Sequence, residues 1–179
     1  MSRKKSYLDE DRWNDLWERF CDVRASTGLF QKLSAAYSEP HRTYHTTEDI
    51  LHCLEEFDHV RDLARWPNEV EMALWFHDAI YDTHAPDNEE KSADWVQRVL
   101  LLNKCPPEIV TRVRDLIMAT KHIMPPIEND AQLVADIDLS SLGQRNWSFW
   151  TMSTPFARNT NGYRKKHIGK NGLKSWYLF

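Results

Sequence analysis

Histidine and aspartate residues fall at three separate places in this sequence where they could together bind a metal ion. The candidates are His45, the adjacent pair His77 and Asp78, and the closely spaced Asp136 and Asp138. A polar pair directly after an apolar helix is costly to bury unless its charge is compensated. Two imidazoles and two carboxylates suit a divalent transition metal, and a metal bound in this way can activate water for hydrolysis.

The same residues also have a simpler interpretation. The helix dipole favours a histidine at a helix C-terminus, so His77 and Asp78 could be a satisfied pair. His45 would then be a surface histidine, and Asp136 and Asp138 would belong to a polar helix face. Spacing alone favours this interpretation, because the separations are long and single His and Asp residues are common.

Helices must position these residues, because apolar residues recur at helical spacing up to about residue 143. The expected helices cover residues 8–20, 29–37, 46–60, 67–79, 87–100, 107–117 and 129–142. Pro67 begins one of them, Asp87 with Glu90 has the spacing of a capping box, and Gly143 closes the last. No segment of the first 143 residues alternates polar and apolar residues for long. The predicted fold class is therefore all-α.

Length and composition exclude several classes of protein. A chain of 179 residues and 21.2 kDa has room for one domain with a real core. No apolar run approaches the roughly 20 residues of a membrane span, and no signal peptide is recognisable after the first Met. The three cysteines, Cys21, Cys53 and Cys105, show no CxxC spacing. We therefore expect reduced thiols in the core and a cytoplasmic protein.

The order of the His and Asp motifs resembles the HD superfamily of metal-dependent phosphohydrolases, in particular a small predicted HD phosphohydrolase family of about this length. The motifs that carry the resemblance are YH at 44–45, WFHDAIYD at 75–82, DNE at 87–89, SA at 92–93, ATK at 119–121, DL at 138–139 and LG at 142–143. They cover most of residues 13–143. The resemblance implies an HD-type helical bundle that hydrolyses a phosphate ester, with nucleotides among the candidate substrates.

The resemblance also implies a ligand set. His45, His77, Asp78 and one of Asp136 and Asp138 are the implied ligands of a divalent ion, with Mn, Co, Ni, Fe, Zn and Mg all compatible. Residues i and i+2 of a helix point about 200° apart, so only one of the two aspartates can face the ion. The residues around Asp138 are closer to the family pattern, and Asp136 stays open.

Four residues are candidates for acting on the substrate. Asp78 could orient a water as well as bind metal, and Lys121 and His122 are placed to meet a phosphate or leaving-group oxygen. Asp82 follows the HD motif closely enough to line the pocket. For Lys121 the alternative is a solvated helix end.

Two residues near the first ligand have expected supporting roles. Arg42 is a second candidate for contact with phosphate. Asp49 stands where relatives often carry a further histidine, and at i+4 it could accept the free ring N–H of His45.

The last part of the chain has a different composition. Residues 1–138 hold all 27 acidic residues and 16 Lys and Arg, whereas residues 139–179 hold 7 Lys and Arg and no acidic residue, giving formal charges of −11 and +7. The family resemblance also stops after residue 143. One interpretation is a basic and aromatic arm that binds nucleic acid.

The interpretation that we favour for this tail is a shifted reading frame. When each codon starts one nucleotide earlier, residues 156–170 can encode IREEYEWVSEETYRE, which is acidic, helix-forming and similar to the missing family segment. We therefore divide the chain into an HD-type domain, 1–143, and an atypical, poorly packed tail, 144–179.

These observations predict a metal-dependent phosphohydrolase with a small phosphorylated substrate. The alternative is a non-catalytic HD-type module that binds metal or nucleotide in a regulatory role. Neither a membrane nor a nucleic acid is an expected partner, and the oligomeric state stays open.

Overall fold

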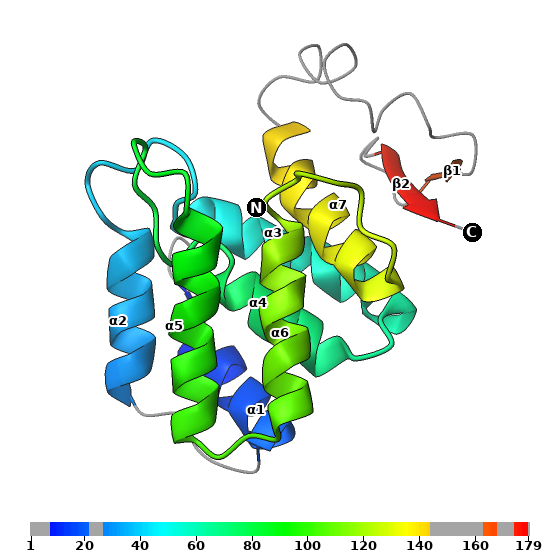
Figure 1. Cartoon of the computed structure of the whole chain (residues 1–179). Helices are drawn as coiled ribbons and strands as arrows, with labels where there is room; N and C mark the ends of the chain where they lie inside the picture. Colours follow the sequence, from blue (N-terminus) through cyan, green and yellow to red (C-terminus); the bar gives the residue numbers. More distant parts are fainter. Residues whose placement is uncertain (1–7, 22–26, 144–162, 168–173, 179) are drawn as a thin grey trace.

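The computed structural model describes residues 8–21, 27–143, 163–167 and 174–178. Its helices are α1 (Glu10–Cys21), α2 (Thr27–Tyr37), α3 (Thr47–Val60), the 3-10 turn η1 (Arg61–Leu63), α4 (Pro67–Phe76), α5 (Asn88–Leu102), α6 (Pro107–Ala119) and α7 (Asn129–Gly143). These helices form a bundle (Figure 1), which confirms the predicted all-α fold for the described residues up to 143. Helix α4 is shorter than expected and ends at Phe76 instead of about residue 79.

Helix α4 lies at the centre of this bundle. Every side chain from Glu69 to Phe76 is buried, and α1, α3, α5, α6 and α7 all contact this helix. A surface helix buries only one stripe of its residues, so burial on all sides identifies α4 as the core helix. The chain that leaves its C-terminal end is therefore held in place by several neighbouring helices.

Aromatic rings fix α1 against α4. The ring centroid of Trp13 lies 5.2 Å from that of Trp75 and 5.9 Å from that of Phe76. Trp13 also meets Trp17 edge to face at 5.7 Å. Edge-to-face and tilted pairs at these distances are favourable arrangements of aromatic quadrupoles.

Two helix starts differ from the sequence-based expectation in their capping. Helix α5 begins after Asp87, but the Asp87 side chain makes no capping hydrogen bond, and Glu90 binds Lys121 instead of closing a capping box. A real capping box begins α3, where Asp49 Oδ2 accepts from the backbone N–H of Thr46 at 2.9 Å. The prediction that Asp49 supports the His45 ring is therefore wrong, because its carboxylate is used to cap the helix.

The expectation of reduced thiols is wrong at Cys105. Cys53 is a buried free thiol on α3, as expected, but Cys105, in the connection between α5 and α6, is disulfide-bonded. Spacing along the chain does not reveal such a bond, because disulfide connectivity cannot be deduced from the sequence alone.

The tail contains two strands, which no pattern in the sequence predicted. Strands β1 (Tyr163–His167) and β2 (Lys174–Leu178) pair antiparallel, with Tyr163 opposite Leu178 and His167 opposite Lys174. The favoured shift in reading frame falls between about residues 143 and 152, where residues 144–152 lie outside the described residues. In the part of the chain that the structure describes, no helix has the length and apolar character needed to cross a membrane.

Candidate metal centre

His77 lies directly after α4, at the C-cap position of this helix. Its Nδ1 donates to the backbone carbonyl of Leu74 at 2.8 Å, and because a carbonyl oxygen can only accept, Nδ1 carries a hydrogen. The other nitrogen, Nε2, lies 3.0 Å from Asp78 Oδ2 and 3.6 Å from Asp138 Oδ1. A neutral His77 would point a lone pair at two carboxylates, so Nε2 must hold either a proton or a cation.

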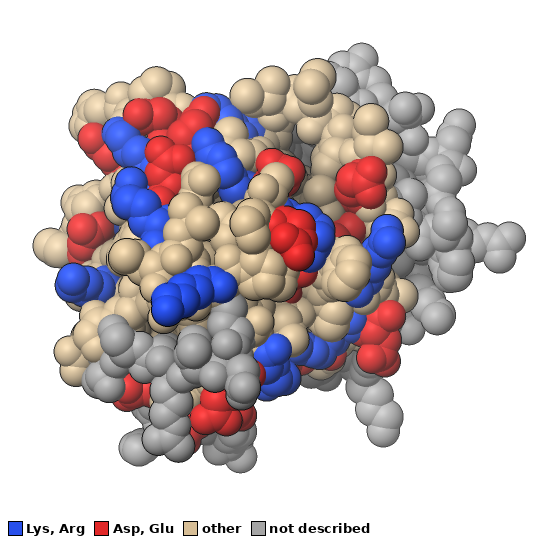
Figure 2. Space-filling model, turned by 60° about the horizontal axis from the view of Figure 1, so that its bottom comes forward, with Lys and Arg blue, Asp and Glu red and all other residues tan. Residues whose placement is uncertain are grey.

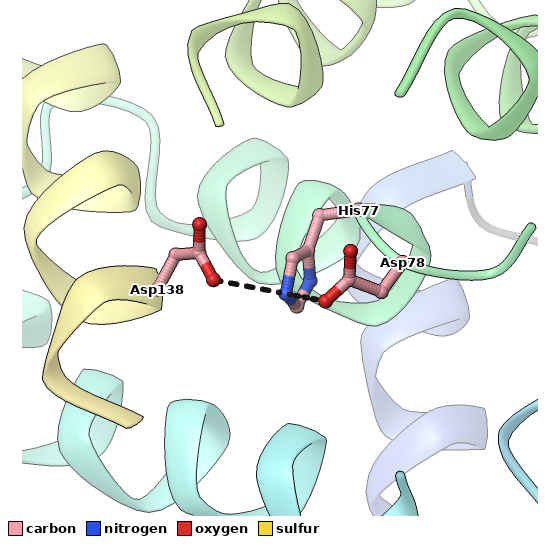
Figure 3. A group of neighbouring side chains, drawn as sticks. All are labelled: His77, Asp78 and Asp138. Carbon is pink, nitrogen blue, oxygen red and sulfur yellow. Dashed lines mark ion pairs between the residues drawn. The ribbon is translucent and has the colours of Figure 1, made fainter. Parts of the chain in front are cut away.

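His77, Asp78 and Asp138 form one group of potential ligands (Figure 3). Each offers one ligand atom, and these atoms all lie within 4.8 Å of one another. Asp138 comes from α7, whereas the other two residues follow α4, so the packing of α7 against α4 assembles the group. His77 and Asp138 are buried, and Asp78 is partly buried.

Two further histidines continue this group on either side. His45 Nδ1 lies 2.5 Å from Asp78 Oδ2, and His122 Nε2 lies 2.8 Å from Asp138 Oδ2. The five side chains thus form an alternating row of three imidazoles and two carboxylates, in the order His45, Asp78, His77, Asp138, His122. The structure brings together four of the five sequence-predicted metal ligands, and it adds His122 beside them.

The electrostatics of this row favour charged side chains. Burial disfavours the protonated form of His77, but the charge of Asp78 and hydrogen bonds to Asp138 and Asp78 outweigh this effect and raise the pKa of His77 well above its ordinary value. Burial likewise disfavours a charged Asp78, yet the neighbouring His77 and His45 hold the pKa of Asp78 far below its ordinary range. The pKa of Asp138 is lowered against the effect of burial by hydrogen bonds to His122 and His77.

Asp136, the alternative to Asp138, lies outside this group of ligand atoms. It is half-buried on α7, and burial raises the pKa of its carboxyl group to about 7 although the charge of His122 opposes the shift. Helical geometry allows only one of the two aspartates to face the cluster, and Asp138 is the one that does.

The other two candidates for substrate contact, Lys121 and Asp82, make their described contacts with residues outside the row. The Lys121 ammonium forms an ion pair with Glu90 of α5. Asp82 lies on the exposed connection between α4 and α5, where its carboxylate accepts from the backbone N–H of His84 at 2.9 Å. Neither side chain has a described contact with the His and Asp row.

Arg42 has a different position from the one expected. Its side chain is fully buried, and its guanidinium donates to the backbone carbonyls of His45 at 3.0 Å, Asp78 at 2.7 Å and Ala79 at 3.2 Å. Its Nε donates to Glu39. The expectation that Arg42 contacts phosphate is therefore wrong, because the side chain is fully buried and these backbone carbonyls and Glu39 take four of its five N–H donors. It joins the loop that carries His45 to the loop that carries Asp78.

The backbone of His45 has an unusual conformation, and Arg42 supports it with a hydrogen bond. Its φ angle is 56°, in the left-handed region that non-glycine residues rarely occupy. The Arg42 hydrogen bond to the His45 carbonyl holds the strained turn directly before Thr46, the N-cap of α3. In this conformation the His45 ring contacts Asp78 and lies against the ring of Tyr81, whose centroid is 4.7 Å away.

Tyr37 of α2 supports the site, a role that was not predicted from the sequence. Its buried hydroxyl donates to the carbonyl of Trp75 at 3.2 Å and accepts from the backbone N–H of Asp78 at 3.3 Å. It therefore fixes the backbone at the end of α4. The sequence gives no signal for this role, because Tyr37 fits the apolar stripe of α2 like any core residue.

The comparisons with known proteins give no match for this chain, whether with protein-family models, with curated proteins or with solved structures. The interpretation of the row therefore depends on its own geometry. That geometry fits a divalent metal. The donor set is mixed nitrogen and oxygen, and the Nδ1–H of His77 donates a hydrogen bond to a backbone carbonyl, as the second ring N–H of a metal-bound histidine usually does.

Proposed function

We propose that this chain is a metal-dependent phosphohydrolase of the HD type that cleaves a phosphate ester. The observation that carries the proposal is the convergence of His45 from the loop before α3, His77 and Asp78 from the end of α4, and Asp138 from α7, with Nε2 of His77 directed at two carboxylates. The motif order that resembles the HD superfamily supports the same assignment.

His77, Asp78 and Asp138 are the side chains that would hold the ion, with His45 placed to join them. When bound, a divalent ion would supply Lewis acidity, which withdraws charge from a phosphate oxygen and makes a water more acidic. The hydrogen bond from His77 Nδ1 to Leu74 fixes the ring orientation and keeps Nε2 available.

The remaining residues of the row would orient ligands and move protons. His122 keeps Nε2 against Asp138 Oδ2, and its partly exposed ring is the group that we assign to proton transfer to the leaving oxygen. We assign Lys121 to binding a phosphate oxygen. Its ion pair with Glu90 means that the substrate must draw the ammonium away from that carboxylate.

The charges of the described residues are mixed on one face of the molecule. On the face shown in Figure 2, Lys and Arg side chains are interspersed with Asp and Glu. A nucleic-acid-binding surface clusters basic side chains along one stripe or patch. No such stripe is visible among the described residues on this face.

The test measures phosphate release by the full chain from a panel of nucleotides and small phosphoesters, with each candidate divalent ion and with a chelator. We expect release only with metal, and loss of release in His77→Ala and Asp78→Asn variants that retain the helical circular dichroism of the parent. His59→Ala, an exposed histidine on α3, is the matched control and should keep full activity. Metal binding without phosphate release from any compound would instead support the non-catalytic regulatory module.

A further inference from the structure

An arginine cluster surrounds a buried carboxylate on the α1 side of α4. The Glu71 side chain of α4 is only 1% exposed. Its Oε1 accepts from Arg12 Nε at 2.8 Å, and its Oε2 accepts from Arg19 Nη2 at 3.2 Å and from Arg61 Nη1 at 2.5 Å. Arg12 and Arg19 lie on α1, whereas Arg61 lies on η1. A buried carboxylate needs compensation, and these three guanidinium groups supply it.

These guanidinium groups provide more positive charge than the carboxylates beside them require. Asp58 is the second carboxylate, and Arg12 binds both of its oxygens at 2.8 and 2.9 Å. Three arginines therefore face two carboxylates, with a formal excess of one positive charge. Two arginines would have been enough to balance the charges of Glu71 and Asp58.

Arg19 and Arg61 also keep unused hydrogen-bond donors in the described structure. Both donate to the same two acceptors, Glu71 Oε2 and Asn68 Oδ1. A guanidinium carries five N–H donors, so each of these two arginines retains three. The two guanidinium groups are held side by side on shared acceptors, which reduces the entropy lost when they bind a third group.

The five charged side chains line an open pocket of about 400 Å³. We call it the arginine pocket, and its lining residues are Arg12, Arg19, Asp58, Arg61 and Glu71. Its volume falls in the range of small-molecule sites. Planar guanidinium forks match the oxygens of phosphate, to which they donate paired hydrogen bonds.

We propose that the arginine pocket binds a phosphate-bearing anion at a site separate from the His and Asp row. Glu71 of α4 precedes His77, the C-cap of this helix, by six positions, which corresponds to a rise of about 9 Å along a helix. No residue is shared between the two sites, and the anion contacts Arg19 and Arg61 through the donors that Glu71 and Asn68 leave open. This binding does not depend on hydrolytic activity.

Inorganic phosphate is the probe for this site. Its binding to the purified full chain is measured by isothermal titration calorimetry and by thermal unfolding, at constant ionic strength maintained with chloride. We expect phosphate to bind and to raise the melting temperature of the parent. Arg19→Gln, at a half-exposed position where Arg12 and Arg61 still pair with Glu71, should bind phosphate about tenfold or more weakly. Arg61→Lys keeps the charge but loses the fork, and it should also weaken binding.

One further variant and a chelator distinguish the arginine pocket from a general charge effect and from phosphate bound at the His and Asp row. Arg114→Gln removes the same charge at a surface pair with Asp94 and should bind phosphate like the parent. Phosphate bound at the His and Asp row would need a metal ion there, so a chelator should leave phosphate binding by the arginine pocket intact. The proposal is overturned if the parent binds no phosphate, if Arg19→Gln binds like the parent, or if the chelator abolishes binding.

Discussion

The guanidinium of Arg42 donates a 2.7 Å hydrogen bond to the backbone carbonyl of Asp78, 36 positions further along the chain. The same group also holds the carbonyl of His45. One buried arginine thus fixes the backbones of two neighbouring members of the His and Asp row. The rings of Tyr37 and Tyr81 lie 5.3 and 5.4 Å from its guanidinium carbon, which adds cation–π attraction.

We predict that Arg42→Lys destabilises the fold. A lysine ammonium keeps the charge but cannot reach the carbonyls of His45, Asp78 and Ala79 with one planar fork. Buried carbonyls without partners should lower the free energy of unfolding by about 2–3 kcal/mol. Urea denaturation measures this change, and the exposed Arg98→Lys is the control. A parent-like stability of Arg42→Lys would show that these hydrogen bonds contribute little.

The second prediction distinguishes the two aspartates of α7. Asp138→Asn should weaken metal binding more than about 100-fold, because outer-shell substitutions alone cost 10–100-fold. Asp136→Asn should bind metal like the parent, because Asp136 lies outside the group of ligand atoms. Calorimetric metal titration and the metal-induced rise in melting temperature measure both variants. The reverse result would assign the ligand role to Asp136.

Several features of the site could be predicted from the sequence, whereas others depend on tertiary contacts that leave no sequence pattern. The order of His45, His77 and Asp78 on helices, together with the family resemblance, predicted their convergence. The role of Arg42 was not predictable, because most of its acceptors are backbone carbonyls, which every residue type offers.

Helix capping also depends on tertiary contacts that the sequence does not reveal. The Asp87 and Glu90 spacing predicts a capping box, yet Glu90 binds Lys121, which follows α6 and lies 31 positions away. A long-range ion pair competes with the local hydrogen bond, and local spacing does not reveal which interaction is stronger. The choice between Asp136 and Asp138 also depended on tertiary contacts. Helical geometry shows that only one of the two can face the site, but it does not show how the helix is rotated about its axis.

The third prediction concerns the reactivity of Cys53. Burial raises the pKa of the Cys53 thiol well above its usual range, and nearby carboxylates including Asp138 act in the same direction. Only the thiolate is nucleophilic, so raising the pH to about 8 should leave native Cys53 almost unreactive. Alkylation with iodoacetamide followed by peptide mass spectrometry measures the rate, and the same reaction in urea is the control. Equal rates in both conditions would contradict the buried position of Cys53 on α3.

The fourth prediction tests the shifted reading frame in the tail. If the frame slips between about residues 143 and 152, the nucleotide sequence must spell IREEYEWVSEETYRE across codons 156–170 when read one nucleotide earlier. A protein made from the restored frame should gain apolar contacts on the helical domain and be more stable by about 2 kcal/mol or more. Urea denaturation should also give a larger m-value, since more surface is buried in the folded state. A chain that ends at Gly143 is the control and should match the stability of the chain with the present tail. Codons that cannot encode the acidic string would exclude the shift, and the basic tail would then be the natural sequence.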